Sequence, residues 1–200
     1  MNKRNVIIVT DGDRAADQAV EIATANVGGR CISLSAGNPT WLAGEDLVKL
    51  IKDAPHDPVV IMVDDRGDDG YGKGESALRH IANHPDIYIL GVLAVASNTA
   101  GVVGVPVDCS IDRDGGIISS PVDKLGFAKA ESQSRLEGDT VDVLNLISPP
   151  VVVGIGDIGK MDRMDDFKSG APLTTMALRE IMERSGFIGS SCSGKQNQTE

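Results

Sequence analysis

The chain has 200 residues and a formal net charge of −10; 41% of its residues are hydrophobic, but only 3% are aromatic. This length and hydrophobic content suit one soluble domain with an aliphatic core. The negative charge disfavours binding to nucleic acid or anionic lipid and favours cations as ligands.

Cysteine usage and the length of the apolar runs predict an intracellular protein. Cys31, Cys109 and Cys192 are widely spaced and form no CxxC pair, which indicates a reducing compartment. The amino-terminal sequence becomes acidic too early for a signal peptide. The longest apolar run, residues 87–96, is about half as long as the roughly 20 residues that a membrane span requires.

The first half of the chain alternates strand and helix patterns. Apolar runs predict strands at residues 5–10, 31–34, 59–63 and 87–96, and helical spacing predicts helices at 14–26, 42–52 and 75–83. Asp13 is placed to cap the first helix. The alternation predicts an α/β fold of three layers, Rossmann-like, with a mostly parallel sheet and helices on both faces.

The second half follows a different pattern. Residues 105–120 alternate apolar and polar side chains around an Arg-Asp-Gly-Gly turn, which predicts a β-hairpin inserted at the sheet edge. Further elements are predicted as a helix over 141–147 capped by Asp139 or Thr140, a strand over 151–156 and a helix over 172–186. Residues 189–200 have few apolar side chains, so we expect a disordered tail after a single domain of residues 1–188.

Polar residues follow each predicted parallel strand. Because the carboxyl ends of parallel strands meet at one edge of a sheet, where open α/β sheets bind ligands, we expect these residues to be neighbours. The richest loop follows the strand at 59–63, and its four glycines would let backbone N–H groups approach a ligand. The predicted ligand-binding residues are Asp11, Asp13, Asn38, Asp64, Asp65, Gly67, Gly70, Gly72, Gly74, Ser97, Asn98 and Asp157.

Several carboxylates at one edge raise one another's pKa unless a cation lies between them. A divalent cation, Mg²⁺ or Ca²⁺, is therefore a candidate cofactor, with Asp11, Asp64 and Asp157 as candidate ligands. An EF-hand is excluded, because Arg66 and Asp69 stand where that loop requires an acidic residue and glycine. Simple separation of the carboxylates in water is the alternative.

The segment VIIVTDGD resembles the first motif of the haloacid dehalogenase-like phosphatases, in which two aspartates perform phosphoryl transfer with magnesium. That resemblance implies Asp11 and Asp13 as catalytic candidates, Ser97 as the second motif, Lys124 or Lys160 as the lysine, and Asp157 and Asp162 as metal ligands. A helix directly after Asp13 would leave no room for the hairpin flap of those enzymes. We therefore do not expect an enzyme, and keep metal-dependent phosphoryl transfer as the alternative.

Longer blocks carry a more specific resemblance. The segments NVIIVTDGDRAA, GGRCISLSAGNPT, GVLAVASNT, VDCSIDRDGG, GDTVDVLN and VGIGDIGKM resemble stage V sporulation protein AE in its soluble form. The resemblance implies an accessory or regulatory protein of bacterial sporulation and spore germination, associated with the membrane machinery that moves calcium dipicolinate. It implies proteins of the same operon as partners and a forespore or spore location, with peripheral association at the inner membrane. A divalent-cation or small-ligand binding module is the remaining alternative.

Overall fold

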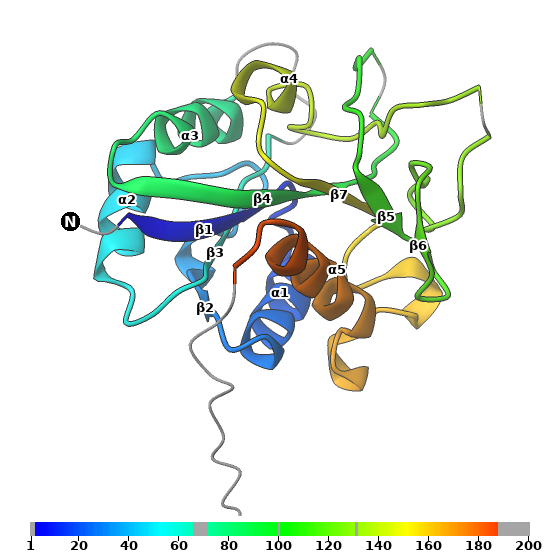
Figure 1. Cartoon of the computed structure of the whole chain (residues 1–200), viewed down its shortest axis with the longest axis horizontal. Helices are drawn as coiled ribbons and strands as arrows, with labels where there is room; N and C mark the ends of the chain where they lie inside the picture. The colour runs from blue at the N-terminus through cyan, green and yellow to red at the C-terminus, as the bar shows by residue number, and fades with distance from the viewer. Residues whose placement is uncertain (1–2, 66–71, 100, 131, 188–200) are drawn as a thin grey trace, which may run out of the picture.

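The computed structural model describes residues 3–65, 72–99, 101–130 and 132–187 as an α/β structure built on one seven-stranded sheet (Figure 1). The strands lie in the order β2-β3-β1-β4-β7-β5-β6. Their bounds are β1 Arg4–Val9, β2 Arg30–Cys31, β3 Val59–Met62, β4 Ile87–Val95, β5 Cys109–Ile111, β6 Ile117–Ile118 and β7 Val152–Ile155. The predicted α/β class, with a mostly parallel sheet and helices on both faces, is confirmed.

Strand β1 lies inside the sheet, between β3 and β4, and its side chains from Val6 to Val9 are apolar on both faces. It pairs in parallel with β3 on one side and with β4 on the other, and β4 pairs in parallel with β7. Residues Val6 to Val9 of β1 are fully buried, as expected for a strand covered by helices on both faces. The parallel pairing places the carboxyl ends of these four strands along one edge, which we call the carboxyl edge.

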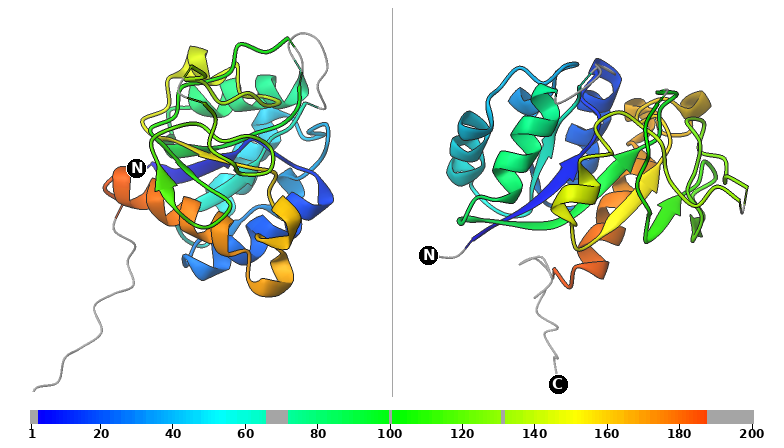
Figure 2. Two further views of the ribbon diagram at one scale, coloured as in Figure 1. Left: turned by 90° about the vertical axis from the view of Figure 1, so that its right-hand side faces the viewer. Right: turned by 90° about the horizontal axis from the view of Figure 1, so that it is seen from above.

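Two helical layers cover the sheet, as Figures 1 and 2 show. One face carries α2 (Gly44–Asp53), α3 (Lys73–Ala82) and the short α4 (Leu144–Ile147), whose apolar residues pack in one core cluster. The other face carries α1 (Arg14–Asn26) and α5 (Pro172–Arg184) over a second cluster. Among the described residues, no helix combines the length and apolar character that crossing a membrane requires.

The predicted hairpin forms at the sheet edge. Strands β5 and β6 are antiparallel, and β5 also pairs in parallel with β7. The Asp112 carboxylate fixes the turn by accepting hydrogen bonds from the backbone N–H groups of Asp114 and Gly116 at 2.9 and 2.7 Å. The hairpin therefore extends the sheet beyond its parallel part.

Two local predictions were wrong. The second strand ends at Cys31 and a 3-10 turn, Ser33–Ser35, follows; there the Ser35 hydroxyl donates to the Ile32 carbonyl and accepts from the Met62 N–H, which turns the chain away from the sheet. The helix spans Leu144–Ile147 with Val143 at its N-cap and no side-chain cap, because it begins too late for the predicted cap residues, Asp139 and Thr140, to reach its first N–H groups. The predicted tail at residues 189–200 lies outside the described residues.

Candidate functional site

The carboxyl edge holds a polar cavity of about 160 Å³ between the ends of β1, β3, β4 and β7. Side chains from segments far apart in the sequence meet there, as the strand pairing requires. Its polar lining residues are Thr10, Asp11, Asp13, Asn38, Asp64, Ser97, Lys124, Asp139, Asp157 and Lys160. The cavity brings together six residues from the predicted ligand-binding set.

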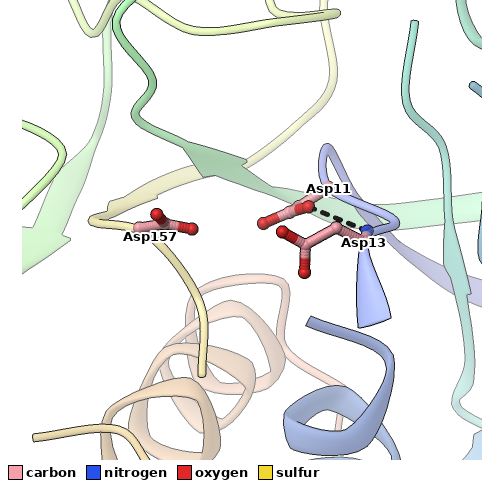
Figure 3. Close-up of side chains that lie close together, drawn as sticks. All are labelled: Asp11, Asp13 and Asp157. Carbon is pink, nitrogen blue, oxygen red and sulfur yellow. Dashed lines mark hydrogen bonds between the residues drawn. The ribbon is translucent and has the colours of Figure 1, made fainter. Parts of the chain in front are cut away.

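Three carboxylates form the centre of this cavity, and we call Asp11, Asp13 and Asp157 the aspartate cluster. One oxygen from each of the three lies within 4.8 Å of the others. Figure 3 shows the Asp157 carboxylate, which follows β7, facing the carboxylates of Asp11 and Asp13, which follow β1. Such a spacing allows one cation to contact all three side chains.

Asp11 is the most deeply placed member of the cluster, with 9% of its surface exposed. Its Oδ1 accepts the backbone N–H of Asp13 at 3.2 Å, and no described residue donates to its Oδ2. Burial and the nearby charges of Asp13, Asp64 and Asp157 together raise the pKa of Asp11 to about 7. The Asp11 carboxyl group therefore changes its charge close to neutral pH.

Asp13 is tied to its surroundings at both oxygens. Its Oδ1 accepts the backbone N–H groups of Ala15 and Ala16 at 2.8 and 3.0 Å and so caps α1, as predicted. Its Oδ2 accepts from the Lys160 ammonium at 2.6 Å. Burial alone would raise the pKa of Asp13, but the Lys160 hydrogen bond and these backbone donors lower it below the ordinary value.

Two lysines compensate the charge of Asp157. The Lys160 ammonium lies 2.9 Å from Asp157 Oδ1, and the Lys124 ammonium lies 3.4 Å from Asp157 Oδ2. Lys160 thus bridges Asp13 and Asp157; its hydrogen bonds to both raise its pKa, although burial acts in the opposite direction. The ammonium is therefore held between two members of the aspartate cluster.

The acidic pair after β3 divides between two environments. Asp64 lines the cavity, and Thr40 fixes its backbone through two hydrogen bonds of 2.8 Å. The Asp65 carboxylate instead accepts the N–H groups of Gly74 and Glu75 at 2.6 and 2.7 Å, at the start of α3. Asp65 is 5% exposed and is not among the residues lining the cavity. It anchors α3 to the end of β3.

The described glycines of the predicted loop permit close packing. A Cβ added to Gly74 would lie 2.7 Å from the backbone oxygen of Asp64, and one added to Gly72 would overlap the Asp65 carboxylate. These positions therefore let the first turn of α3 contact the end of β3. Gly67 and Gly70 lie outside the described residues.

The end of β4 contributes a hydroxyl group to the cavity. The Ser97 hydroxyl accepts the backbone N–H of Asp139 at 3.0 Å and is 2.7 Å from the Thr99 hydroxyl. This contact brings Asp139, which the sequence pattern placed at a helix cap, to the cavity lining. Asn38 also lines the cavity, whereas Asn98 is not among its lining residues. Asp139 arrives through a non-local contact that no local motif indicates.

A buried acidic residue, Asp165, supports the loop that carries Lys160. Asp165 is fully buried, and its carboxylate accepts three backbone N–H groups, those of Gly159, Leu173 and Thr174, at 2.9 to 3.1 Å. The Thr174 hydroxyl donates to it as well, at 2.6 Å. Asp165 thus joins the first turn of α5 to the loop after β7.

Comparison with known proteins gives one family match. The family model described as "Stage V sporulation protein AE1" matches residues 5–185, which include every described residue of the cavity lining. Searches against curated proteins and against solved structures found no match.

Proposed function

Because the chain belongs to the stage V sporulation protein AE family, we propose that it is a non-catalytic accessory protein of sporulation and spore germination that binds a divalent cation at the aspartate cluster. The family supports the sporulation process. The cluster supports the cation, because three carboxylates converge on one point of a polar cavity.

The observation that carries the cation site is the environment of Asp11. A carboxylate that is nine-tenths buried, with Asp13, Asp64 and Asp157 nearby, needs hydrogen bonds or a positive partner to be stabilised in its charged form, and the Asp11 carboxylate accepts one hydrogen bond from the described residues. Figure 3 shows the Asp11 oxygen that has no dashed line pointing toward Asp157, and this oxygen receives no hydrogen bond from a described residue. A cation bound there would supply the missing stabilisation.

Mg²⁺ and Ca²⁺ both suit the donor set, since each prefers carboxylate oxygens. Three side-chain oxygens leave further coordination positions for water. A cavity of about 160 Å³ has room for an ion with several waters, each of which takes roughly 30 Å³ in the liquid.

Removing a cluster carboxylate is expected to weaken cation binding. Asp157→Asn removes one ligand charge, and we expect the Kd for Mg²⁺ and Ca²⁺ at pH 8, measured by calorimetric titration, to rise at least about tenfold. Asp114→Asn, an exposed carboxylate outside the cavity, is the control and should bind like the parent protein. Equal affinity in all three proteins would contradict the assignment.

Cation affinity is expected to depend on pH. Binding requires Asp11 in its charged form, and its pKa of about 7 means that roughly one proton is released per ion below that pH. The Kd for Mg²⁺ should therefore fall about tenfold between pH 6 and pH 8. Titrations in buffers of different ionisation enthalpy measure the released proton directly, and a Kd that is flat across this range would refute the role of Asp11.

The finer cellular role is also part of the proposal. We propose that the protein associates with other products of its sporulation operon, including the membrane proteins that move calcium dipicolinate, at the forespore or spore inner membrane. The family membership supports this. Affinity purification from sporulating cells, with the tagged full chain, should retain those membrane proteins. Failure to retain any of them would count against the association.

Phosphoryl transfer is a second candidate, favoured by the composition of the cavity. Ser97 and both candidates for the lysine of the phosphatase-like pattern, Lys124 and Lys160, line the same cavity as the aspartate cluster. Against it, α1 begins at Arg14 and Asp13 is engaged as its cap. Mg²⁺-dependent hydrolysis of a phosphomonoester that is lost in Asp11→Asn would replace the non-catalytic proposal by this one.

A further inference from the structure

Lys160 occupies the position that a cation on the aspartate cluster would need. Its Nζ lies 2.6 Å from Asp13 Oδ2 and 2.9 Å from Asp157 Oδ1. These are two of the three side chains whose oxygens lie within 4.8 Å of one another. The Lys160 side chain is 44% exposed, so its ammonium can leave the cluster toward solvent without crossing the core.

An ion bound between Asp13 and Asp157 competes with the ammonium for the same oxygens. Mg²⁺ binds carboxylate oxygen at about 2.1 Å and Ca²⁺ at about 2.4 Å. An ion at these distances would lie in the space that the hydrogen-bonded ammonium occupies. Two positive charges this close also repel each other strongly inside a partly buried cavity. A cation that binds to the cluster must therefore displace Lys160.

The displacement favours divalent ions over monovalent ones. Exchanging the ammonium for Na⁺ or K⁺ replaces one positive charge by another, and the ammonium has the advantage of being attached to the chain. Exchanging it for a dication adds one unit of positive charge beside the buried Asp11 carboxylate. Only the second exchange improves the charge balance of the cluster.

We propose that Lys160 is the specificity-determining residue of the cation site: it competes with every cation for Asp13 and Asp157, and so excludes monovalent ions while lowering the affinity for divalent ones. This inference rests on the proposed cation-binding function. It assigns to Lys160 a role that the aspartates alone do not provide.

The test is a Mg²⁺ titration of the full chain at pH 8 with Lys160→Met, in NaCl and in choline chloride of equal concentration. Choline is a monovalent cation too bulky to enter between the carboxylates. The two salts therefore give the same ionic strength, but only Na⁺ can compete with Mg²⁺ for the carboxylates. In choline chloride we expect Lys160→Met to bind Mg²⁺ about tenfold more tightly than the parent. In NaCl the variant should lose much of this gain, whereas the parent should have the same Kd in both salts.

Two further variants make the result specific. Lys160→Gln retains a hydrogen-bond donor without the charge. Circular dichroism will check that this variant is folded, and its Kd for Mg²⁺ should then equal that of Lys160→Met. Lys49→Met removes a surface lysine that pairs with Asp46 at the same distance of 2.9 Å, and should leave the Kd unchanged.

The outcomes separate this inference from the function on which it rests. A parent protein that binds Mg²⁺, with equal or weaker binding in both Lys160 variants, would overturn the role of Lys160 and leave the cation site standing. Absence of binding in the parent and in both variants would overturn the two proposals together. Tighter, Na⁺-sensitive binding in the variants supports both.

Discussion

Asp11→Asn is expected to increase the free energy of unfolding at pH 8 by about 4 kcal/mol in the presence of a chelator. The native state raises the pKa of this carboxyl group from 3.8 to about 7, and each pKa unit corresponds to about 1.4 kcal/mol. Asparagine has the same shape without the charge, and its side-chain oxygen can still accept the Asp13 N–H.

The sign follows from proton binding. Between pH 3.8 and pH 7 the unfolded chain has released the Asp11 proton while the folded chain retains it, so stability falls as pH rises through this window and is constant above it. The advantage of asparagine should therefore be only about 2 kcal/mol at pH 5 and reach its full value at pH 8. Urea denaturation at both pH values measures the difference.

A control variant, Asp114→Asn, and the addition of Mg²⁺ test this prediction further. Asp114→Asn, on the exposed hairpin turn, should change stability by less than about 0.5 kcal/mol at either pH. Saturating Mg²⁺ should stabilise the parent at pH 8 and not the Asp11→Asn variant, because a ligand stabilises only the protein that binds it. A destabilised Asp11→Asn variant at pH 8 would show that the charge has a partner in the native protein.

Asp165→Ala is expected to destabilise the protein by about 3 kcal/mol. The substitution removes the acceptor for three N–H groups, of which those of Leu173 and Thr174 are buried and that of Gly159 is partly buried. Burial raises the pKa of Asp165, and its hydrogen bonds offset this only in part. Removing the charge therefore recovers part of the stability that is lost with the hydrogen bonds. Urea denaturation at pH 7 measures the net effect.

The neighbouring Asp166 provides a matched control for this prediction. It caps a 3-10 turn, Phe167–Ser169, through one hydrogen bond of 2.9 Å to the Lys168 N–H, so Asp166→Ala should cost only about 1 kcal/mol. Because Asp165 also holds the Gly159 N–H beside Lys160, its variant should alter cation binding as well. Equal costs for the two variants would show that Asp165 does not join α5 to the loop.

The elements that the sequence predicts well are those whose pattern is local. Helix α1 has the predicted bounds, because Asp13 at its cap and the buried Ala16, Ala19 and Ala23 are within one short segment. The second strand was predicted too long, because the apolar pattern of residues 31–34 gives no sign of the Ser35 hydroxyl, whose hydrogen bonds turn the chain toward Met62.

The candidate site shows the same division. The sequence places Asp64 and Asp65 together at the end of a strand, but successive side chains in extended backbone point to opposite sides. One of them therefore lines the cavity and the other anchors α3, and the sequence alone does not distinguish them.

By itself, the sequence determined the alternation of strands and helices, and with it the edge of the sheet where Asp11, Asp13 and Asp157 would meet, because parallel pairing aligns the ends of strands. The tertiary structure alone decided which carboxylate of the aspartate cluster is buried with no cationic partner among the described residues and which two are held by Lys160. The physical reason is that burial and charge pairing depend on segments that are distant in the sequence. Lys160, in the loop after β7, is 147 residues from Asp13 along the chain, yet its Nζ lies 2.6 Å from Asp13 Oδ2.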